Sequence, residues 1–501
     1  MSVLPDLRRI TVRQSPRSPT RKVLESFDQI IVVAPKSPSE KLLRGIPQTA
    51  SLRKLLSRSG GQSASTRLGG PNATGLLLST FTASTAFNAL NWSKGVVAEA
   101  LRDHPGKLAL LAVGLTDDDR RTALTSLVAA AEAAAFDMPT FQSVTDKRRR
   151  LSSVTVLDSQ SRLDLDSIRA QALGNDIARW FTALPPNKLT ASSYRKAIEA
   201  LASQYDLNSR FYNENQLEKL GAGAFLAVSQ GNADRDAGIL HLRYRPKKQR
   251  SPDVALVGKG ILFDTGGTNL KPFKSMLDMH MDMQGSAVAL GTLVALAELG
   301  APFAVDAWLA ITPNRLSARS YKSQDVISAS NGTTIQVIHT DAEGRMVLAD
   351  TLALASKEKP GLILDFATLT GTCVAALTER YSGVFSNRRA ANALMRKAGE
   401  SSGERVWPFP MDPDFDESLK SEIADIKQCS PAGSGDHILA ARFLSRFVPD
   451  EVPWIHVDLS AGQNKGGLGH VPTEVTGFGV KLTLEFLSKN DPLEIGDKLS
   501  K

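Results

Sequence analysis

The stretch 254–350 constrains the fold more than any other, because it places charged side chains directly after a segment typical of a buried strand. Residues 254–257 are a short aliphatic run that ends at Gly258, which predicts a core strand followed by a glycine-rich loop. Charges at the end of a core strand are costly to desolvate unless they are paired or bound to a metal. Open α/β sheets bind their ligands at such strand ends. The sequence therefore predicts an α/β fold with a polar site at the end of this strand.

Seven charged residues of this stretch stand among apolar or glycine-rich neighbours: Lys259, Asp264, Lys271, Asp282, Asp341, Glu343 and Arg345. Asp341 and Glu343 are two positions apart, so an extended backbone would direct both carboxylates to one face, ahead of a helix expected from about Met346. Asp264 precedes a Gly-Gly pair, where bare backbone lets a ligand approach closely. Oxygen-rich ligation suits divalent ions such as Mg²⁺, Mn²⁺ or Zn²⁺. A buried salt-bridge network without chemistry is the alternative interpretation.

These residues form motifs that resemble the catalytic signature of the leucyl aminopeptidase family, the dinuclear metallo-aminopeptidases of the cytosol aminopeptidase type. Six residues of the family hallmark N-T-D-A-E-G-R stand at 340–345, and the upstream motif G-K-G-I-x-F-D-x-G-G matches 258–267. The segment P-N-K-L-T at 186–190 resembles the family's entry to its catalytic domain. The resemblance covers roughly 170–485. It implies a two-domain α/β protein, with a small N-terminal mixed α/β domain and a larger C-terminal α/β/α catalytic domain around a mostly parallel sheet.

The resemblance also implies two divalent metal ions in each subunit, either Mn or Zn, with Mg as a further candidate. Asp264, Asp341 and Glu343 would hold one ion. The other ion would bind Lys259 and Asp282 and would share Asp264 and Glu343 with the first. A lysine ligand must be a neutral amine, and two adjacent dications would lower its pKa enough to permit that.

The remaining implied roles concern the reaction and the substrate. Lys271 would polarise the scissile carbonyl and stabilise the oxyanion. Arg345 would anchor a bicarbonate ion that acts as general base on a metal-bridging water. The loop after the strand expected at 362–367 would line the pocket for the first substrate side chain. The pocket candidates are Met279, Thr368, Leu369 and Gly371. Met279 could equally belong to the core.

Length and composition fit such a protein. A chain of 501 residues exceeds one domain core, and we expect an N-terminal domain over 1–160, a linker helix over 161–187 and the catalytic domain over 188–501. No apolar run reaches the ~18 residues of a membrane span, so we expect no integral membrane protein. Cys373 and Cys429 have no C-x-x-C spacing, which favours neither a disulfide framework nor a thiolate zinc site. This use of cysteine is compatible with a reducing compartment, so we expect the protein in the cytoplasm.

The positive charge is concentrated at the N-terminus. Residues 1–60 contain twelve Lys and Arg against four Asp and Glu, which equals the net charge of +8 for the whole chain. A solvated tail with an edge strand of the first domain is the simplest interpretation. An organellar transit peptide and a nucleic-acid-binding arm stay open. Prolines at 5, 16 and 19 disfavour an amphipathic targeting helix.

Periodicity and turn signals predict the local elements. The expected strands are 29–34, 108–113, 238–244 as an edge strand, 304–311 and 362–367, with a hairpin over 326–338. The expected helices are 122–135, 163–183, 194–205 and 286–299. The Ser- and Gly-rich segment 57–74 is predicted to be a long loop.

The pattern departs from the family at a few positions. His339 replaces the first residue of the hallmark, and we favour a packing or supporting role for it. The segments 322–326 and 431–437 also differ, which affects side-chain preference and loop conformation. The resemblance implies a broad, leucine-type aminopeptidase that acts on peptides and assembles as a homohexamer. A DNA-binding or scaffolding protein and a two-metal phosphohydrolase are the alternatives, and retention of all seven polar site residues disfavours the former.

Overall fold

The computed structural model describes residues 3–16, 18–69, 72–144, 150–158, 162–247, 249 and 251–500, apart from the side chains of 497 and 500. The chain divides into two compact units. The N-terminal unit contains Asp6–Ala172 and Lys465–Glu474, and the C-terminal unit is mainly Leu173–Asn464 and Val475–Lys501. Helix α5 (Leu165–Thr182) begins in the first unit and ends in the second. The expected boundary at 160 and Arg17 of the basic stretch lie outside the described residues.

A six-stranded sheet forms the centre of the N-terminal unit. Its strands, in spatial order, are β1 (Thr11–Gln14), β6 (Ser153–Val156), β5 (Lys107–Ala112), β2 (Gln29–Ala34), β4 (Gly75–Thr80) and β3 (Ser63–Arg67). All neighbours are parallel except β3 and β4, so the sheet is mixed. β1 lies at one edge, which confirms the edge strand expected in the basic stretch.

Helices cover both faces of this sheet. They are α1 (Arg21–Leu24), α2 (Thr49–Arg58), α3 (Ala86–Ala100) and α4 (Asp117–Ala135). The fully buried strand β2 alternates between two cores, because Ile31 belongs to the core under α3 and α4 and Ile30 to the core under α2. The loop predicted over 57–74 was wrong in part, because it contains the end of α2 and strand β3. The serines of β3 are tolerated on an edge strand, where one side of the backbone needs no partner.

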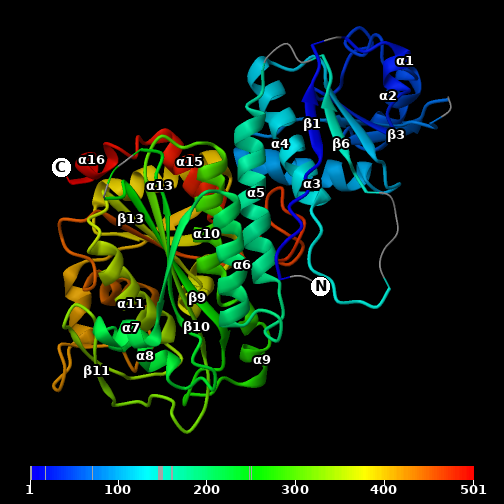
Figure 1. The fold of residues 1–501 in the computed structure, drawn as a ribbon. Helices are drawn as coiled ribbons and strands as arrows, with labels where there is room; N and C mark the ends of the chain where they lie inside the picture. The colour runs from blue at the N-terminus through cyan, green and yellow to red at the C-terminus, as the bar shows by residue number, and fades with distance from the viewer. Residues whose placement is uncertain are drawn as a thin grey trace. The chain divides into compact units, whose positions relative to one another are not determined.

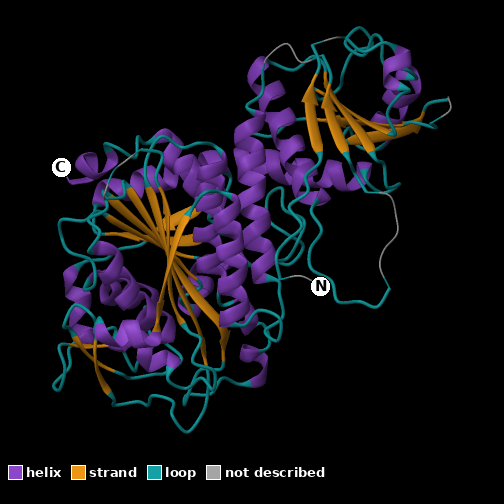
Figure 2. Ribbon diagram, viewed as in Figure 1, coloured by secondary structure: helices purple, strands orange, loops and turns teal. Residues whose placement is uncertain are grey.

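An eight-stranded, mostly parallel sheet forms the centre of the C-terminal unit (Figures 1 and 2). Its strands, in spatial order, are β15 (Val406–Pro408), β14 (Ser382–Ser386), β17 (Trp454–Asp458), β13 (Leu362–Ala367), β9 (Val254–Asp264), β10 (Val305–Asn314), β8 (Gly238–Tyr244) and β7 (Asn208–Asn213). The central strands β17, β13, β9 and β10 are parallel to one another. A small sheet joins β11 (Val326–Ser328), β12 (Thr334–Gln336) and β16 (Ile426–Lys427), and its antiparallel β11–β12 pair is the expected hairpin.

Helices pack on both faces of the large sheet, as the α/β/α expectation requires. In Figure 1, α10, α13 and α15 lie on one face and α7, α8 and α11 on the other. The helices of this unit, besides the end of α5, are α6 (Ala191–Gln204), α7 (Glu214–Lys219), α8 (Gly223–Ser229), α9 (Phe273–Met276), α10 (Gln284–Glu298), α11 (Glu343–Ser356), α12 (Gly371–Leu377), α13 (Arg389–Ser402), α14 (Asp436–Ser445), α15 (Val480–Lys489) and α16 (Ile495–Ser500).

Strand β8 has the predicted bounds but is not an edge strand. β7 pairs with its outer side in antiparallel register. The sequence of β7, N-S-R-F-Y-N, is polar and mostly exposed, so it carries no strand signal of its own and was missed. Among the described residues, none of the helices has the length and hydropathy needed to cross a membrane.

Candidate active site

The site begins where β9 ends. The strand is buried almost to its last residue, Asp264, and the chain then turns through Gly266 at a φ of +86°, a conformation that favours glycine. Asp264 Oδ1 accepts hydrogen bonds from the Gly266 backbone nitrogen at 2.9 Å and from Asn314 Nδ2 at 2.8 Å. Asn314 is the last residue of the neighbouring strand β10. Two adjacent strand ends therefore fix this carboxylate.

A second part of the site lies at the start of α11. The helix begins at Glu343 and not near Met346, so the extended backbone predicted for 341–343 was wrong. The reason is Gly344, which is a poor helix former but is required here because a Cβ would lie 2.5 Å from Lys259 Cε. Asp341 lies in the turn before the helix. Its carboxylate and that of Glu343 converge on Asp264 all the same.

Lys259 joins the strand to the helix. It is 3% exposed, and its Nζ donates to Asp282 Oδ1 at 2.8 Å and to the Thr368 carbonyl at 2.7 Å. Glu343 Oε1 lies 3.1 Å from the same Nζ. Thr368 Oγ1 in turn donates to Asp282 Oδ1 at 2.7 Å. Lys259, Asp282 and Glu343, expected as ligands of one ion, therefore lie together.

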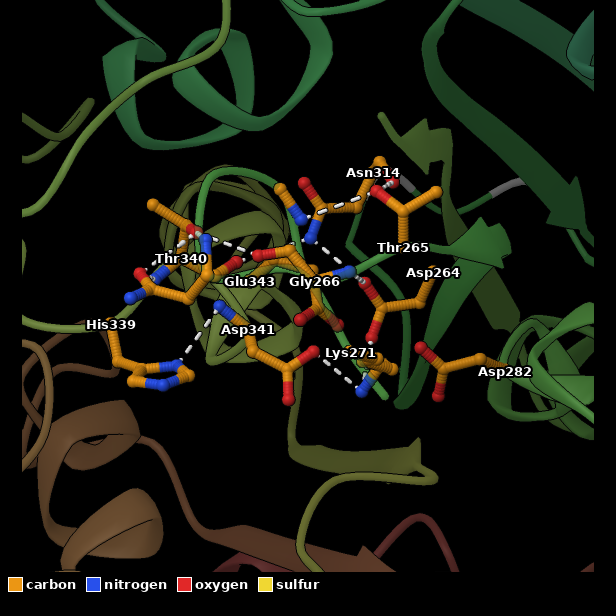
Figure 3. Close-up of polar contacts among 12 residues, drawn as sticks. Asp264, Thr265, Gly266, Lys271, Asp282, Asn314, His339, Thr340, Asp341 and Glu343 are labelled. Carbon is orange, nitrogen blue, oxygen red and sulfur yellow. Dashed lines mark hydrogen bonds and ion pairs between the residues drawn. The ribbon is translucent and has the colours of Figure 1, made fainter. Parts of the chain in front are cut away.

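Lys271 lies between two carboxylates (Figure 3). Its Nζ is 2.9 Å from Asp264 Oδ2 and 2.5 Å from Asp341 Oδ1, and Figure 3 shows these side chains reaching it from two sides. Thr340 supports the same loop, because its hydroxyl donates to the Gly266 carbonyl at 2.6 Å. The lysine side chain is 13% exposed, so its ammonium remains within reach of a bound molecule.

The cluster fits a divalent cation. Ligand oxygens of Asp264, Asp341 and Glu343 all lie within 4.8 Å of one another. Four carboxylates face only two lysines, which leaves two negative charges unbalanced in a buried region when all are ionised. Within the described part of the chain, Asp282 Oδ2 and Glu343 Oε2 are buried without a hydrogen-bond partner. Buried carboxylate oxygens of this kind are expected to be paired or bound to metal.

Burial and mutual repulsion shift the titration of these groups. Burial raises the pKa of Glu343, and the Asp264 carboxylate raises it further; the same two causes raise the pKa of Asp341. Burial would lower the pKa of Lys259, but the carboxylates of Asp282 and Glu343 outweigh it and raise that pKa. A divalent cation would reverse these shifts, because it favours ionised carboxylates and a neutral amine.

A cavity of about 410 Å³ adjoins the cluster. Ten of the eleven residues expected in the site line it, and these are Lys259, Asp264, Lys271, Met279, Asp282, Asp341, Glu343, Thr368, Leu369 and Gly371. Val374 and Leu459 add apolar wall, while Asp278, Glu379 and Gln463 are polar lining residues that the sequence analysis did not single out. Met279 therefore faces the cavity instead of belonging to the core.

Arg345 is the predicted residue that does not line this cavity. It is 1% exposed in the first turn of α11, and both of its terminal nitrogens bind the carboxylate of Asp436. His339 lies in the loop that leads into α11, and its Nδ1 accepts a hydrogen bond from the Asp341 backbone nitrogen at 3.3 Å. This contact agrees with a supporting role for His339, which stays a prediction.

The Cytosol aminopeptidase family model, in the part that describes the catalytic domain, matches residues 176–484. The chain belongs to the cytosol aminopeptidase family. It is accordingly a leucyl-type metallo-aminopeptidase, as the sequence motifs indicated.

Relatives extend this result beyond the catalytic domain. A probable cytosol aminopeptidase of Parasynechococcus marenigrum (strain WH8102) is 35% identical over 79% of this chain and 82% of its own length. One of Synechococcus sp. (strain CC9311) is 34% identical over 85% of this chain and 87% of its own. The solved structure of a mutant tomato leucine aminopeptidase superimposes with a TM-score of 0.81 at 26% identity, covering 97% of this chain and 98% of that one. The similarity thus includes both units.

Two supporting residues of this aminopeptidase were missed by the sequence analysis. Asn314 appeared only as a strand end after Pro313, and Asp436 only as part of a segment that departs from the family pattern. Asn314 could have been found from the open α/β rule, since it ends the strand beside β9. Nothing in the sequence marks Asp436 as the partner of Arg345, because 91 residues separate them.

Proposed function

We propose that this aminopeptidase uses two divalent ions, one held by Asp264, Asp341 and Glu343, the other by Lys259, Asp264, Asp282 and Glu343. The observation that carries the proposal is the close approach of three carboxylates, whose oxygens lie within 4.8 Å of one another at the wall of a cavity. The excess of carboxylates over lysines supports it. Mn or Zn is the expected metal, with Mg as a third candidate.

The chain's own groups would position these ligands and the substrate. Bound ions would supply an activated water at neutral pH and polarise the scissile carbonyl. Asn314 holds Asp264, and Thr368 holds Asp282, by hydrogen bonds that fix the orientation of each carboxylate. Lys271 would donate a hydrogen bond to the carbonyl oxygen as negative charge develops there. Its ammonium state agrees with this role, because carboxylates surround it.

The substrates would be peptides with a free N-terminus, and the first side chain would occupy the cavity. Its lining combines apolar Met279, Leu369 and Val374 with the small Gly371. Such a surface suits leucine and side chains of similar size, which supports broad, leucine-type specificity.

The wider context of the proposal follows the family. We expect a homohexamer located in the cytoplasm; the resemblance also implies a bicarbonate ion at Arg345. Nucleic-acid binding through residues 1–60 stays a prediction, and part of that charge is already paired, since Arg8 binds Asp6 and Arg21 binds Glu25.

Lys271→Ala tests the proposed roles. Removing a group that stabilises the oxyanion costs about 10²- to 10³-fold in kcat, whereas metal content should stay at two ions per chain. The measurement is a panel of aminoacyl amides with Mn or Zn, together with metal analysis of each purified variant. Lys274→Ala is the matched control, because Lys274 lies exposed three residues further along the same segment. A Lys271 variant as active as the Lys274 control would contradict the proposal.

A further inference from the structure

The two terminal nitrogens of Arg345 already bind an anion that belongs to the protein. Nη1 donates to Asp436 Oδ1 at 3.0 Å and Nη2 to Asp436 Oδ2 at 2.6 Å. Nη1 also donates to the Gln428 carbonyl at 3.2 Å. Two parallel N–H···O bonds from one guanidinium edge to one carboxylate are the strongest and most directional arrangement available to arginine.

The backbone on both sides of this pair is anchored. Asp436 is the first residue of α14 and follows Gly435, which has a φ of +64°. The next residue, His437, holds the hydroxyl of Thr372 with both its backbone nitrogen and its ring Nδ1, each at 3.0 Å. Thr372 follows Gly371, which lines the cavity. Asp436 is therefore fixed between Arg345 and the wall of the active site, and is not a loose surface side chain.

A bicarbonate ion and a carboxylate would bind the same edge of the Arg345 guanidinium. Both are planar anions that present two oxygens to a guanidinium edge, and Asp436 already occupies the edge formed by the two terminal nitrogens. The remaining nitrogen, Nε, is buried and has no hydrogen-bond partner among the described residues, so an ion from solution could bind it only if the surrounding atoms moved. A tethered carboxylate also competes at the high effective concentration of an intramolecular group. The residues present therefore do not fit a bicarbonate ion bound at Arg345 in the expected way.

We propose that Asp436 is the resident anion of Arg345, so that this aminopeptidase, acting as proposed above, works without dissolved bicarbonate. Asp436 is a positioning residue in this proposal, because it acts through Arg345. Its side chain is 24% exposed, so truncation would open the position to small anions from solution. The proposal thus makes bicarbonate unnecessary for the natural sequence and useful to a variant that lacks the Asp436 carboxylate.

The test compares wild type with Asp436→Ala and Asp436→Asn in carbon-dioxide-free buffer and across a bicarbonate series. We expect wild-type kcat/KM to be flat across the series. The variants should lose about 10- to 100-fold, the range typical for a group that orients an active-site residue. Bicarbonate, and formate as a second small anion, should restore activity to Asp436→Ala. Crystals of wild type and Asp436→Ala grown with bicarbonate give an independent readout, with an ion on Arg345 expected in the variant alone.

Asp416→Ala is the matched control, because Asp416 also binds an arginine through two oxygens, at 2.7 Å each from Arg442, and is 21% exposed. Bicarbonate should not restore any activity that this control loses. Wild type that requires bicarbonate, or that binds it on Arg345 in crystals, would overturn the proposal, as would variants that keep full activity without it. An inactive wild type with metals bound would instead contradict the proposed function, and the crystals would still decide the role of Asp436.

Discussion

Two buried charged clusters of the C-terminal unit differ in their balance of positive and negative charge. In the first, Asp306 on β10 lies 2.8 Å from His241 Nε2 and 2.5 Å from Arg245 Nη1, and the His241 ring stacks on Trp308 at 3.7 Å between centroids. One carboxylate there faces one guanidinium and one imidazole. In the second, four carboxylates face two lysines at the end of β9.

The difference shows which feature marks a metal site. Both clusters are buried, so burial of charge alone does not separate a structural network from a reactive one. The Asp306 cluster has no negative charge left over and is not among the residues that line the cavity. The β9 cluster has an excess of negative charge and a cavity beside it. We therefore infer that the first cluster stabilises the fold, and we propose that the second binds metal.

The largest expected effect is a loss of activity on substitution in the β9 cluster that substitution in the Asp306 cluster does not cause. Glu343→Gln would remove a proposed shared metal ligand, and a loss of about 4 kcal/mol of transition-state stabilisation corresponds to about 10³-fold in kcat. Asp306→Asn should leave the activity per folded molecule within about twofold but lower stability by about 3 kcal/mol, because it breaks a buried ion pair. Kinetics on the folded fraction and thermal unfolding of each variant check both. Equal losses of activity in Glu343→Gln and Asp306→Asn would contradict the distinction between a metal-binding and a structural cluster.

A smaller effect is the dependence of metal binding on pH. The pKa values of Asp341 and Glu343 are raised by burial and by the Asp264 carboxylate, so these groups bind protons at a higher pH than free carboxyls do. A metal must displace those protons, and its affinity should therefore fall as pH decreases, by up to about tenfold per pH unit for each proton released. Titration calorimetry in buffers of different ionisation enthalpy measures the protons released. In the Asp306→Asn variant the dependence of metal affinity on pH should be the same as in wild type.

The smallest effect concerns stability after metal removal. In a chelator-treated sample the excess negative charge is repulsive, so Glu343→Gln should stabilise the C-terminal unit by about 1 kcal/mol relative to chelated wild type. Carboxylates with raised folded-state pKa values contribute stability that is present at low pH and is lost as pH rises through those values. The gain should accordingly grow between acidic and neutral pH. Urea denaturation at both pH values tests this, and a destabilised Glu343→Gln would contradict it.

Much of the central fold could be predicted from sequence. β2, β8 and β13 have the predicted bounds, because each is a short run of branched or aliphatic residues between turn signals. β7 and β3 could not be found, since polar edge strands are stabilised by pairing with a neighbour and not by their own pattern. The start of α11 was predicted too late because Gly344 is a poor helix former. Glycine is needed there because a side chain at this position would collide with Lys259.

The residues of the site could be predicted about as well as the central strands. The motifs named the carboxylates and lysines of the charged cluster at the cavity wall, because ligand chemistry restricts the residue types allowed at those positions. The partners that orient these residues differ in this respect. Asn314 could have been found from its place at the end of the strand beside β9, whereas only the tertiary structure brings Asp436 to Arg345.

The most direct measurement is anomalous diffraction from crystals of active protein grown with manganese or zinc. We expect two anomalous peaks in the cavity, one ligated by Asp264, Asp341 and Glu343 and the other by Lys259, Asp264, Asp282 and Glu343. Fully active crystals without anomalous density at these carboxylates would contradict the two-metal proposal.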